Sequence, residues 1–155
     1  MKIKKFNELT EAQLDKIINK HYSHWSQYSP LMTLEDTKNK IKNVYTSNNL
    51  PYGIAMFEND NLIGFCMLKD FDLKEYPDIT PNICNIMIFD DYRGKGYGTK
   101  LVEFAKQELK KLGYNKAYLW TDKAPEFYEK IGFTYVKDVL KNDKTGYGRL
   151  YSIDI

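Results

Sequence analysis

The chain has only two cysteines and five prolines among its 155 residues. Two cysteines cannot form the dense disulfide framework of a small secreted domain. We therefore expect Cys66 and Cys84 to be reduced, buried thiols, with a disulfide between neighbouring strands as the less favoured alternative. No apolar run is long enough to span a bilayer, and no signal-peptide core follows Met1. These absences favour a cytoplasmic protein without a membrane partner.

Net charge is also small. The 23 lysines and arginines against 21 aspartates and glutamates leave +2 at pH 7, which predicts no strong attraction to nucleic acid. A hydrophobic content of 43% and a charged content of 28% are globular values. The length fits one domain over residues 1–155, present as a monomer or a homodimer.

Histidine is scarce as well. His21 and His24 are the only two, and no cysteine or carboxylate stands near them at a metal-ligand spacing. We expect exposed histidines and no metal. The thirteen tyrosines accompany many lysines, asparagines and isoleucines, which indicates an AT-rich bacterial genome rather than an aromatic binding surface.

Glycine, in contrast, is concentrated in one place. The run Tyr92–Thr99 reads YRGKGYGT and follows an apolar, strand-like stretch at 83–89, and a helical pattern at 101–112 comes after it. Glycines let the backbone turn tightly and approach a ligand. The following helix begins with unpaired N–H groups and the positive end of its dipole. The run therefore predicts an anion site, and the usual anion is phosphate.

The glycine spacing fits neither of two common nucleotide motifs. A P-loop needs four residues between its glycines and a Ser or Thr directly after Gly-Lys. A dinucleotide fingerprint needs a third small residue where Thr99 stands, and an acidic residue about twenty positions later. A nucleotide-binding protein and a plain turn both stay open as alternatives.

Local patterns predict a mixed α/β sheet of about seven strands with four helices. Thr10 with Gln13 forms a capping box, Thr33 caps a second helix, and Gly113 ends a third. The turn Asn59–Asn61 predicts a hairpin. The expected strands are 2–6, 50–58, 62–69, 83–89, 116–121, 133–139 and 148–154, and the expected helices are 11–22, 34–46, 101–112 and 124–131.

The pattern Arg93-x-x-Gly96-x-Gly98 resembles the Q/R-x-x-G-x-G/A signature of GNAT-type N-acetyltransferases, which hold the pyrophosphate of acetyl-CoA. The run Phe127–Phe133 (FYEKIGF) resembles the second signature of the family, Tyr-x-Lys-x-Gly-Phe at a helix end. The similarity is strong over about residues 50–140 and looser over the rest of the chain. It implies the GNAT acyl-CoA N-acyltransferase fold, with strands four and five splayed apart, and acetyl transfer from acetyl-CoA to a primary amine.

The resemblance also implies a cofactor site. In the family the pantetheine arm pairs with the fourth strand, and the Ile88 N–H here would bind the developing oxyanion. Backbone N–H groups of the glycine run would bind the pyrophosphate, with added charge from two side chains, Arg93 and Lys95. The implied cofactor residues are Ile86, Met87, Ile88, Arg93, Gly94, Lys95, Gly96, Tyr97, Gly98 and Thr99.

By the same resemblance, Tyr128 is the candidate general acid that protonates the departing thiolate. A phenol has a pKa near 10 and a thiol near 8.5, so the transfer depends on thiolate character in a dry site. A purely structural tyrosine is the alternative. The general base stays open among four aspartates, and Cys84 as a nucleophile is less favoured. These aspartates are Asp70, Asp72, Asp78 and Asp122.

The amine acceptor, a small molecule or a peptide, should bind near the first two helices and the 70–81 loop. Aromatic rings beside carboxylates suit a cationic amine. The candidate substrate residues are Trp25, Asp72, Tyr76 and Asp122. A non-catalytic acyl-CoA-binding sensor or interaction module is the alternative function, and the presence of Tyr128 argues against it.

Overall fold

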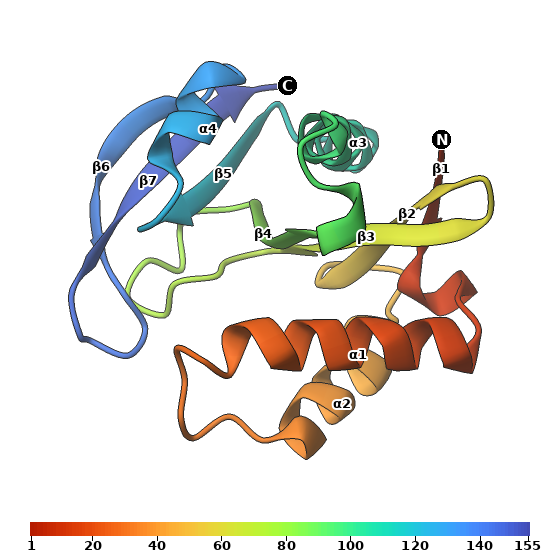
Figure 1. Ribbon diagram of the computed structural model, residues 1–155. Coiled ribbons are helices and arrows are strands. Elements are labelled where there is room, and N and C mark those ends of the chain that lie inside the picture. Colours follow the sequence, from red (N-terminus) through yellow and green to blue (C-terminus); the bar gives the residue numbers. More distant parts are fainter. The chain divides into compact units, whose positions relative to one another are not determined.

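A computed structural model describes all 155 residues (Figure 1). Seven strands form a sheet in the order β1-β2-β3-β4-β5-β7-β6, which confirms the predicted mixed α/β fold with four α-helices. The strands are β1 (Lys2–Lys5), β2 (Tyr52–Glu58), β3 (Asn61–Lys69), β4 (Asn82–Ile88), β5 (Lys116–Thr121), β6 (Thr134–Leu140) and β7 (Tyr147–Asp154). The α-helices are α1 (Glu11–Trp25), α2 (Leu34–Asn43), α3 (Tyr97–Lys111) and α4 (Pro125–Lys130), and two 3₁₀ turns are η1 (Phe6–Glu8) and η2 (Asp90–Tyr92).

Contacts divide the chain into two compact units. The first unit comprises residues 1–67 and 85–101, and the second comprises residues 68–84 and 102–155. The prediction of a single domain over residues 1–155 stays a prediction.

In the first unit, α1 starts at the predicted capping box. The Gln13 N–H donates to Thr10 Oγ1 at 3.2 Å, and the Thr10 N–H donates to Gln13 Oε1 at 3.0 Å. Such reciprocal bonds satisfy two N–H groups that the helix leaves unpaired. The helix buries Ile17 and Ile18 and lies alongside α2, next to β2 and β3 (Figure 1). It continues to Trp25, three residues past the predicted end.

The predicted C-terminus of α2 was wrong by one turn. Thr33 caps the helix as expected, with Asp36 as its partner, but the helix ends at Asn43. Tyr45 lies beyond the helix, and its N–H donates to the Lys40 carbonyl at 3.0 Å. Its side chain is buried. Val44, which lies within the predicted helix 34–46, is outside the helix and 42% exposed.

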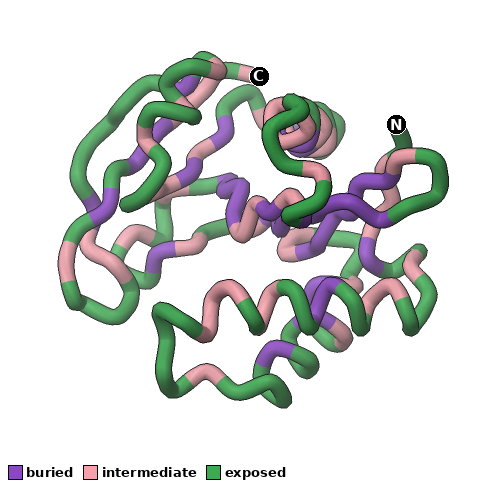
Figure 2. The backbone as a smooth tube through the Cα atoms, in the orientation of Figure 1, coloured by how far each residue is buried: buried purple, intermediate pink, exposed green.

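The β2–β3 hairpin forms the apolar centre of the first unit. Asn59 and Asp60 have φ of 49° and 66°, as both central residues of the predicted tight turn require. From Tyr52 to Phe57 every residue of β2 is buried, and β3 is buried from Leu62 to Leu68 (Figure 2). Ile3 of β1 pairs with Met56 at the antiparallel edge.

In the second unit, β7 pairs antiparallel with both β5 and β6. β4 and β5 pair in parallel at Asn82 and Tyr118, and their splaying beyond that pair stays a prediction. Leu73, Val139 and Leu150 form a small buried cluster. By contrast β6 is exposed from Thr134 to Asp138 (Figure 2).

The part of α3 in the second unit ends as predicted, at Gly113 with φ 97°. Val102, Ala105 and Leu109 are buried. Leu112, the last residue of the predicted helix 101–112, lies past the last helical residue and is 42% exposed.

Candidate active site

The end of β4 is held closely against β3 in the first unit. The Phe89 N–H donates to the Ile63 carbonyl at 2.8 Å. A Cβ on Gly64 would lie 2.5 Å from the Met87 carbonyl oxygen and 2.8 Å from Ile88 Cδ1. Only glycine permits this approach, so Gly64 sets the position of the strand that the cofactor would meet. Nothing in the local pattern around Gly64 predicted this role.

Asn85 interrupts β4 directly before the three predicted pantetheine residues. Its φ is 51°, a left-handed conformation that asparagine adopts more readily than most residues. Each residue of a strand carries a backbone N–H donor and a C=O acceptor that bind independently of where its side chain packs. Ile86 and Ile88 are half-buried and Met87 is buried. Their backbone can therefore serve a ligand while the side chains pack.

The glycine run forms a tight loop before α3. Gly94 and Gly96 have φ of 75° and 82°, and a Cβ at either position would meet no atom within 4 Å. These two glycines are thus needed for the backbone conformation and not for space within the chain. Gly98 lies inside the first turn of α3.

The N-terminus of α3 opens directly onto this loop. The helix begins at Tyr97, four residues before the predicted pattern, and the Lys100 N–H bonds to the Gly96 carbonyl at 3.3 Å. The first N–H groups of an α-helix have no acceptor within the helix. Those of Tyr97, Gly98 and Thr99 lie at the positive end of the helix dipole, an arrangement that suits the predicted anion.

Two of the longer side chains of the loop, Arg93 and Tyr97, have protein partners. Arg93 Nε donates to the Ile88 carbonyl at 2.9 Å, and Nη1 lies 3.3 Å from Asp90 Oδ1. A hydrogen bond from the Tyr97 hydroxyl to the Glu58 carboxylate raises the pKa of Tyr97. Lys95 is exposed. The groups left for the predicted anion site are therefore mainly backbone groups.

Tyr128 lies on α4 in the second unit and is half-buried. Its ring packs edge-on against Phe127 at 5.1 Å and Phe133 at 5.9 Å, measured between centroids. Gly132 has φ 107°, and the Phe133 N–H bonds to the Tyr128 carbonyl at 3.0 Å. The Gly-Phe of the second signature thus turns the chain back so that Phe133 supports the Tyr128 ring.

Asp72 is bonded on both carboxylate oxygens in the second unit. Trp120 Nε1 donates to Oδ2 at 2.8 Å, and Lys69 Nζ lies 3.2 Å from Oδ1. Asn142 of the β6–β7 turn donates to the Asp72 carbonyl at 2.9 Å and accepts from the Lys74 N–H at 2.8 Å. The predicted substrate residue Asp72 therefore fastens the 70–81 loop. Trp120 and Asn142 were not predicted.

The other two predicted acceptor residues of this unit also have partners. The Tyr76 hydroxyl accepts from the Leu140 N–H at 3.0 Å, and the Lys137 ammonium lies 5.0 Å from the Tyr76 ring centroid. Asp122 pairs with Lys141 at 3.0 Å. Whether any of them contacts an amine stays a prediction.

Replacing Asp72 by alanine should lower the free energy of unfolding by about 1–3 kcal/mol, because the Trp120 indole N–H and the Lys69 ammonium lose their acceptor. Urea denaturation of the purified variant measures this. Asp78→Ala, an exposed carboxylate of the same loop, should change the free energy by less than about 0.5 kcal/mol. Equal losses would contradict a fastening role for Asp72.

Trp25, the predicted acceptor residue of the first unit, lies in an aromatic cluster. Its ring centroid is 4.5 Å from that of His21, 4.7 Å from that of His24 and 6.4 Å from that of Phe65. The two histidines are half-buried. The expectation that they are exposed was wrong, because α1 continues through Trp25 and stacks these rings on one another.

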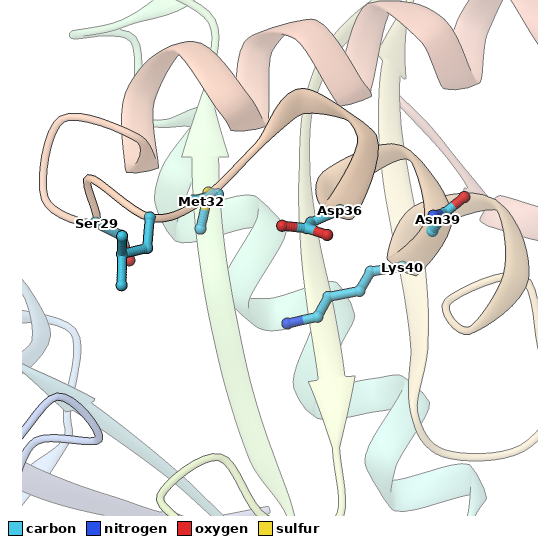
Figure 3. A pocket seen from close by; sticks show the side chains of 6 residues that line it. Ser29, Met32, Asp36, Asn39 and Lys40 are labelled. Atoms are coloured by element: carbon cyan, nitrogen blue, oxygen red, sulfur yellow. The ribbon is translucent and has the colours of Figure 1, made fainter.

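A surface pocket of about 440 Å³ lies on the connection from α1 to α2. Asp36 and Lys40 project to the same side of α2, with Ser29 and Met32 on the connection itself (Figure 3). Trp25 does not line it. The Asp36 carboxylate also accepts the Thr33 N–H at 3.4 Å, so the acidic group of the pocket is part of the helix cap.

Cys66 and Cys84 are buried thiols that form no disulfide, as expected. Burial raises the pKa of the Cys66 thiol well above its usual value, so this cysteine is not an activated nucleophile. No group of three or more histidine, cysteine or carboxylate side chains could hold a metal ion. None of the helices combines the length and the apolar character that crossing a membrane requires.

The fold and the site together define an α/β protein whose fourth strand leads through a glycine loop to the N-terminus of α3. Residues 13–133 match the Acetyltransferase (GNAT) family, and the chain belongs to that family.

Solved structures agree with this fold. An aminoglycoside 6'-N-acetyltransferase complexed with coenzyme A superposes with a TM-score of 0.75 at 18% identity, over 99% of this chain and 97% of that one. The PaiA N-acetyltransferase of Thermoplasma acidophilum in complex with coenzyme A gives 0.66 at 20% identity, over the whole of both chains.

A curated relative is similar in sequence. N-alpha-acetyltransferase 30 of Schizosaccharomyces pombe is 28% identical over an alignment of 94 residues, and the match covers 58% of this chain. The match spans about three fifths (62%) of that relative.

Proposed function

We propose that the protein is an acetyl-CoA-dependent N-acetyltransferase that moves an acetyl group to a primary amine of a small molecule or peptide. One observation carries the proposal: two positive-φ glycines lead from the end of β4 into the unpaired N–H groups of α3. That arrangement suits a pyrophosphate. Family membership and coenzyme A complexes of structural neighbours support the choice of acetyl-CoA.

The reaction is direct attack on the thioester. The neutral amine nitrogen forms a bond to the acetyl carbonyl carbon, and the Ile88 N–H stabilises the oxyanion. The C–S bond then breaks, and the hydroxyl of Tyr128 gives a proton to the thiolate. The amine loses its proton to a carboxylate or to water. Among the predicted bases, Asp72 and Asp122 already pair with lysines.

The acceptor class follows from similar proteins and from chemistry. The neighbours include aminoglycoside and PaiA acetyltransferases, and the curated relative is an N-alpha-acetyltransferase. All these names describe transfer to amines, so primary amines are the acceptors to test. A screen for acetyl-CoA consumption over aminoglycosides, polyamines, lysine and peptide N-termini tests the proposal. If acetyl-CoA binds but no amine is acetylated, the non-catalytic acyl-CoA-binding module is favoured instead.

Acetyl-CoA should raise the melting temperature, because it binds the folded chain only. At about a hundred times its Kd the gain is about 2.7 kcal/mol, or roughly 5–10 °C for a domain of this size. Coenzyme A should act similarly and ATP weakly, and differential scanning fluorimetry measures all three. Equal stabilisation by ATP would favour a nucleotide-binding protein.

A further inference from the structure

Arg93 is one of the two charged side chains that the family resemblance assigns to the pyrophosphate, yet it is directed to the backbone at the end of β4. Its Nε donates to the Ile88 carbonyl at 2.9 Å, and Nη1 pairs with Asp90 at 3.3 Å. We propose that Arg93 is a positioning residue that fixes the last peptide of β4, and that it is not a pyrophosphate ligand. The inference rests on the proposed function of this loop.

The peptide between Ile88 and Phe89 is hydrogen-bonded at both ends. Its carbonyl accepts from Arg93, and its N–H donates to the Ile63 carbonyl at 2.8 Å. The backbone of Arg93 closes the same turn, since its N–H donates to the Asp90 carbonyl at 3.3 Å. Arg93 therefore joins the end of β4 to the start of the glycine loop through side chain and main chain together.

Fixing this peptide fixes Ile88, whose N–H is the proposed oxyanion donor. A misplacement of about 1 Å at a reacting centre can reduce the rate about 100-fold. A backbone donor cannot be removed by mutation, but the side chain that orients it can. Asp90 also offsets the charge of Arg93, whereas Lys95 in the same loop is exposed and has no such partner among the ion pairs. Lys95 is thus the better source of charge for an anion.

Glutamine is the informative replacement at position 93. Its Nε2 is the same number of bonds from Cα as the Nε of arginine, so it can donate to the Ile88 carbonyl without carrying charge. Lysine keeps the charge but places its ammonium one bond further out. Methionine keeps the length and removes both properties. A positioning role ranks Arg93→Gln above Arg93→Lys in activity, and a charge role ranks them in the opposite order.

The test compares two acetyl donors, acetyl-CoA and acetyl-pantetheine, which lacks the pyrophosphate and the nucleotide. We expect Arg93→Met to lower kcat/KM at least about tenfold with both donors, and Arg93→Gln to restore most of the loss. Lys95→Gln should lower kcat/KM with acetyl-CoA only, more so at low salt.

Loss confined to acetyl-CoA in Arg93→Met, or Arg93→Lys more active than Arg93→Gln, would overturn the inference. If Arg93→Met does not fold, the order of the glutamine and lysine variants still decides. Wild-type protein that acetylates no amine with either donor would refute the proposed function instead, so the two failures are distinct.

Discussion

Replacing Tyr128 by phenylalanine is expected to lower kcat by at least about tenfold while the affinity for acetyl-CoA changes little. The change keeps the ring between Phe127 and Phe133 and removes only the hydroxyl. General acids contribute about 100- to 10,000-fold, and water can replace part of that. Steady-state kinetics with acetyl-CoA and the amine from the screen measure the effect. The high-pH limb of the kcat profile should also move, because the acid that it reports is gone.

Tyr135→Phe is the matched control for this change. It removes a tyrosine hydroxyl that donates to Asp138 on the exposed strand β6, so kcat should not change. If Tyr128→Phe also keeps full kcat and loses only stability, Tyr128 is structural and water is the proton source. The proposed cofactor site would be unaffected by that result.

Replacing Gly96 by valine should weaken acetyl-CoA binding roughly 5- to 150-fold. A non-glycine residue held in such a disfavoured conformation costs about 1–3 kcal/mol, which corresponds to that range. With φ 82° at this position, the loop either bears the strain or leaves the conformation that directs its N–H groups. Isothermal titration with coenzyme A measures the affinity directly.

Gly96→Asn provides the comparison, because asparagine accepts left-handed backbone more readily than valine. A smaller loss with asparagine means that the backbone conformation is what matters. Equal losses mean that any Cβ contacts the ligand, since the chain itself leaves the space open. Unchanged affinity in both variants would show that the loop is a plain turn.

Local signals predicted most of the fold. The cap of Thr10 with Gln13, the turn at Asn59 and Asp60 and the helix end at Gly113 each depend on a few adjacent residues, and all three were correct. The predicted end of α2 was wrong because the helix stops where the following residues pack, and Tyr45 is buried although it lies beyond the helix. Periodicity cannot show where tertiary contacts end a helix.

The same distinction applies to the candidate site. The loop before α3 was predictable because glycine spacing acts locally. The bond of Trp120 to Asp72 joins residues 48 positions apart, and no local pattern encodes it. The hydrogen bond of Arg93 to a main-chain carbonyl was also hidden, because sequence shows charge but not the direction of a side chain.

The missing Cβ at Gly64 limits how cofactor segments can be exchanged among relatives. The proposed cofactor residues all lie within one segment of the chain, 86–99, which could be exchanged as a unit when chimeras are built. Position 64 of the recipient must nevertheless be glycine, because a Cβ there would lie 2.5 Å from the Met87 carbonyl oxygen. A recipient with alanine would displace the graft even though it contained every transplanted residue. A chimera therefore needs the segment 86–99 together with a glycine at position 64 of β3.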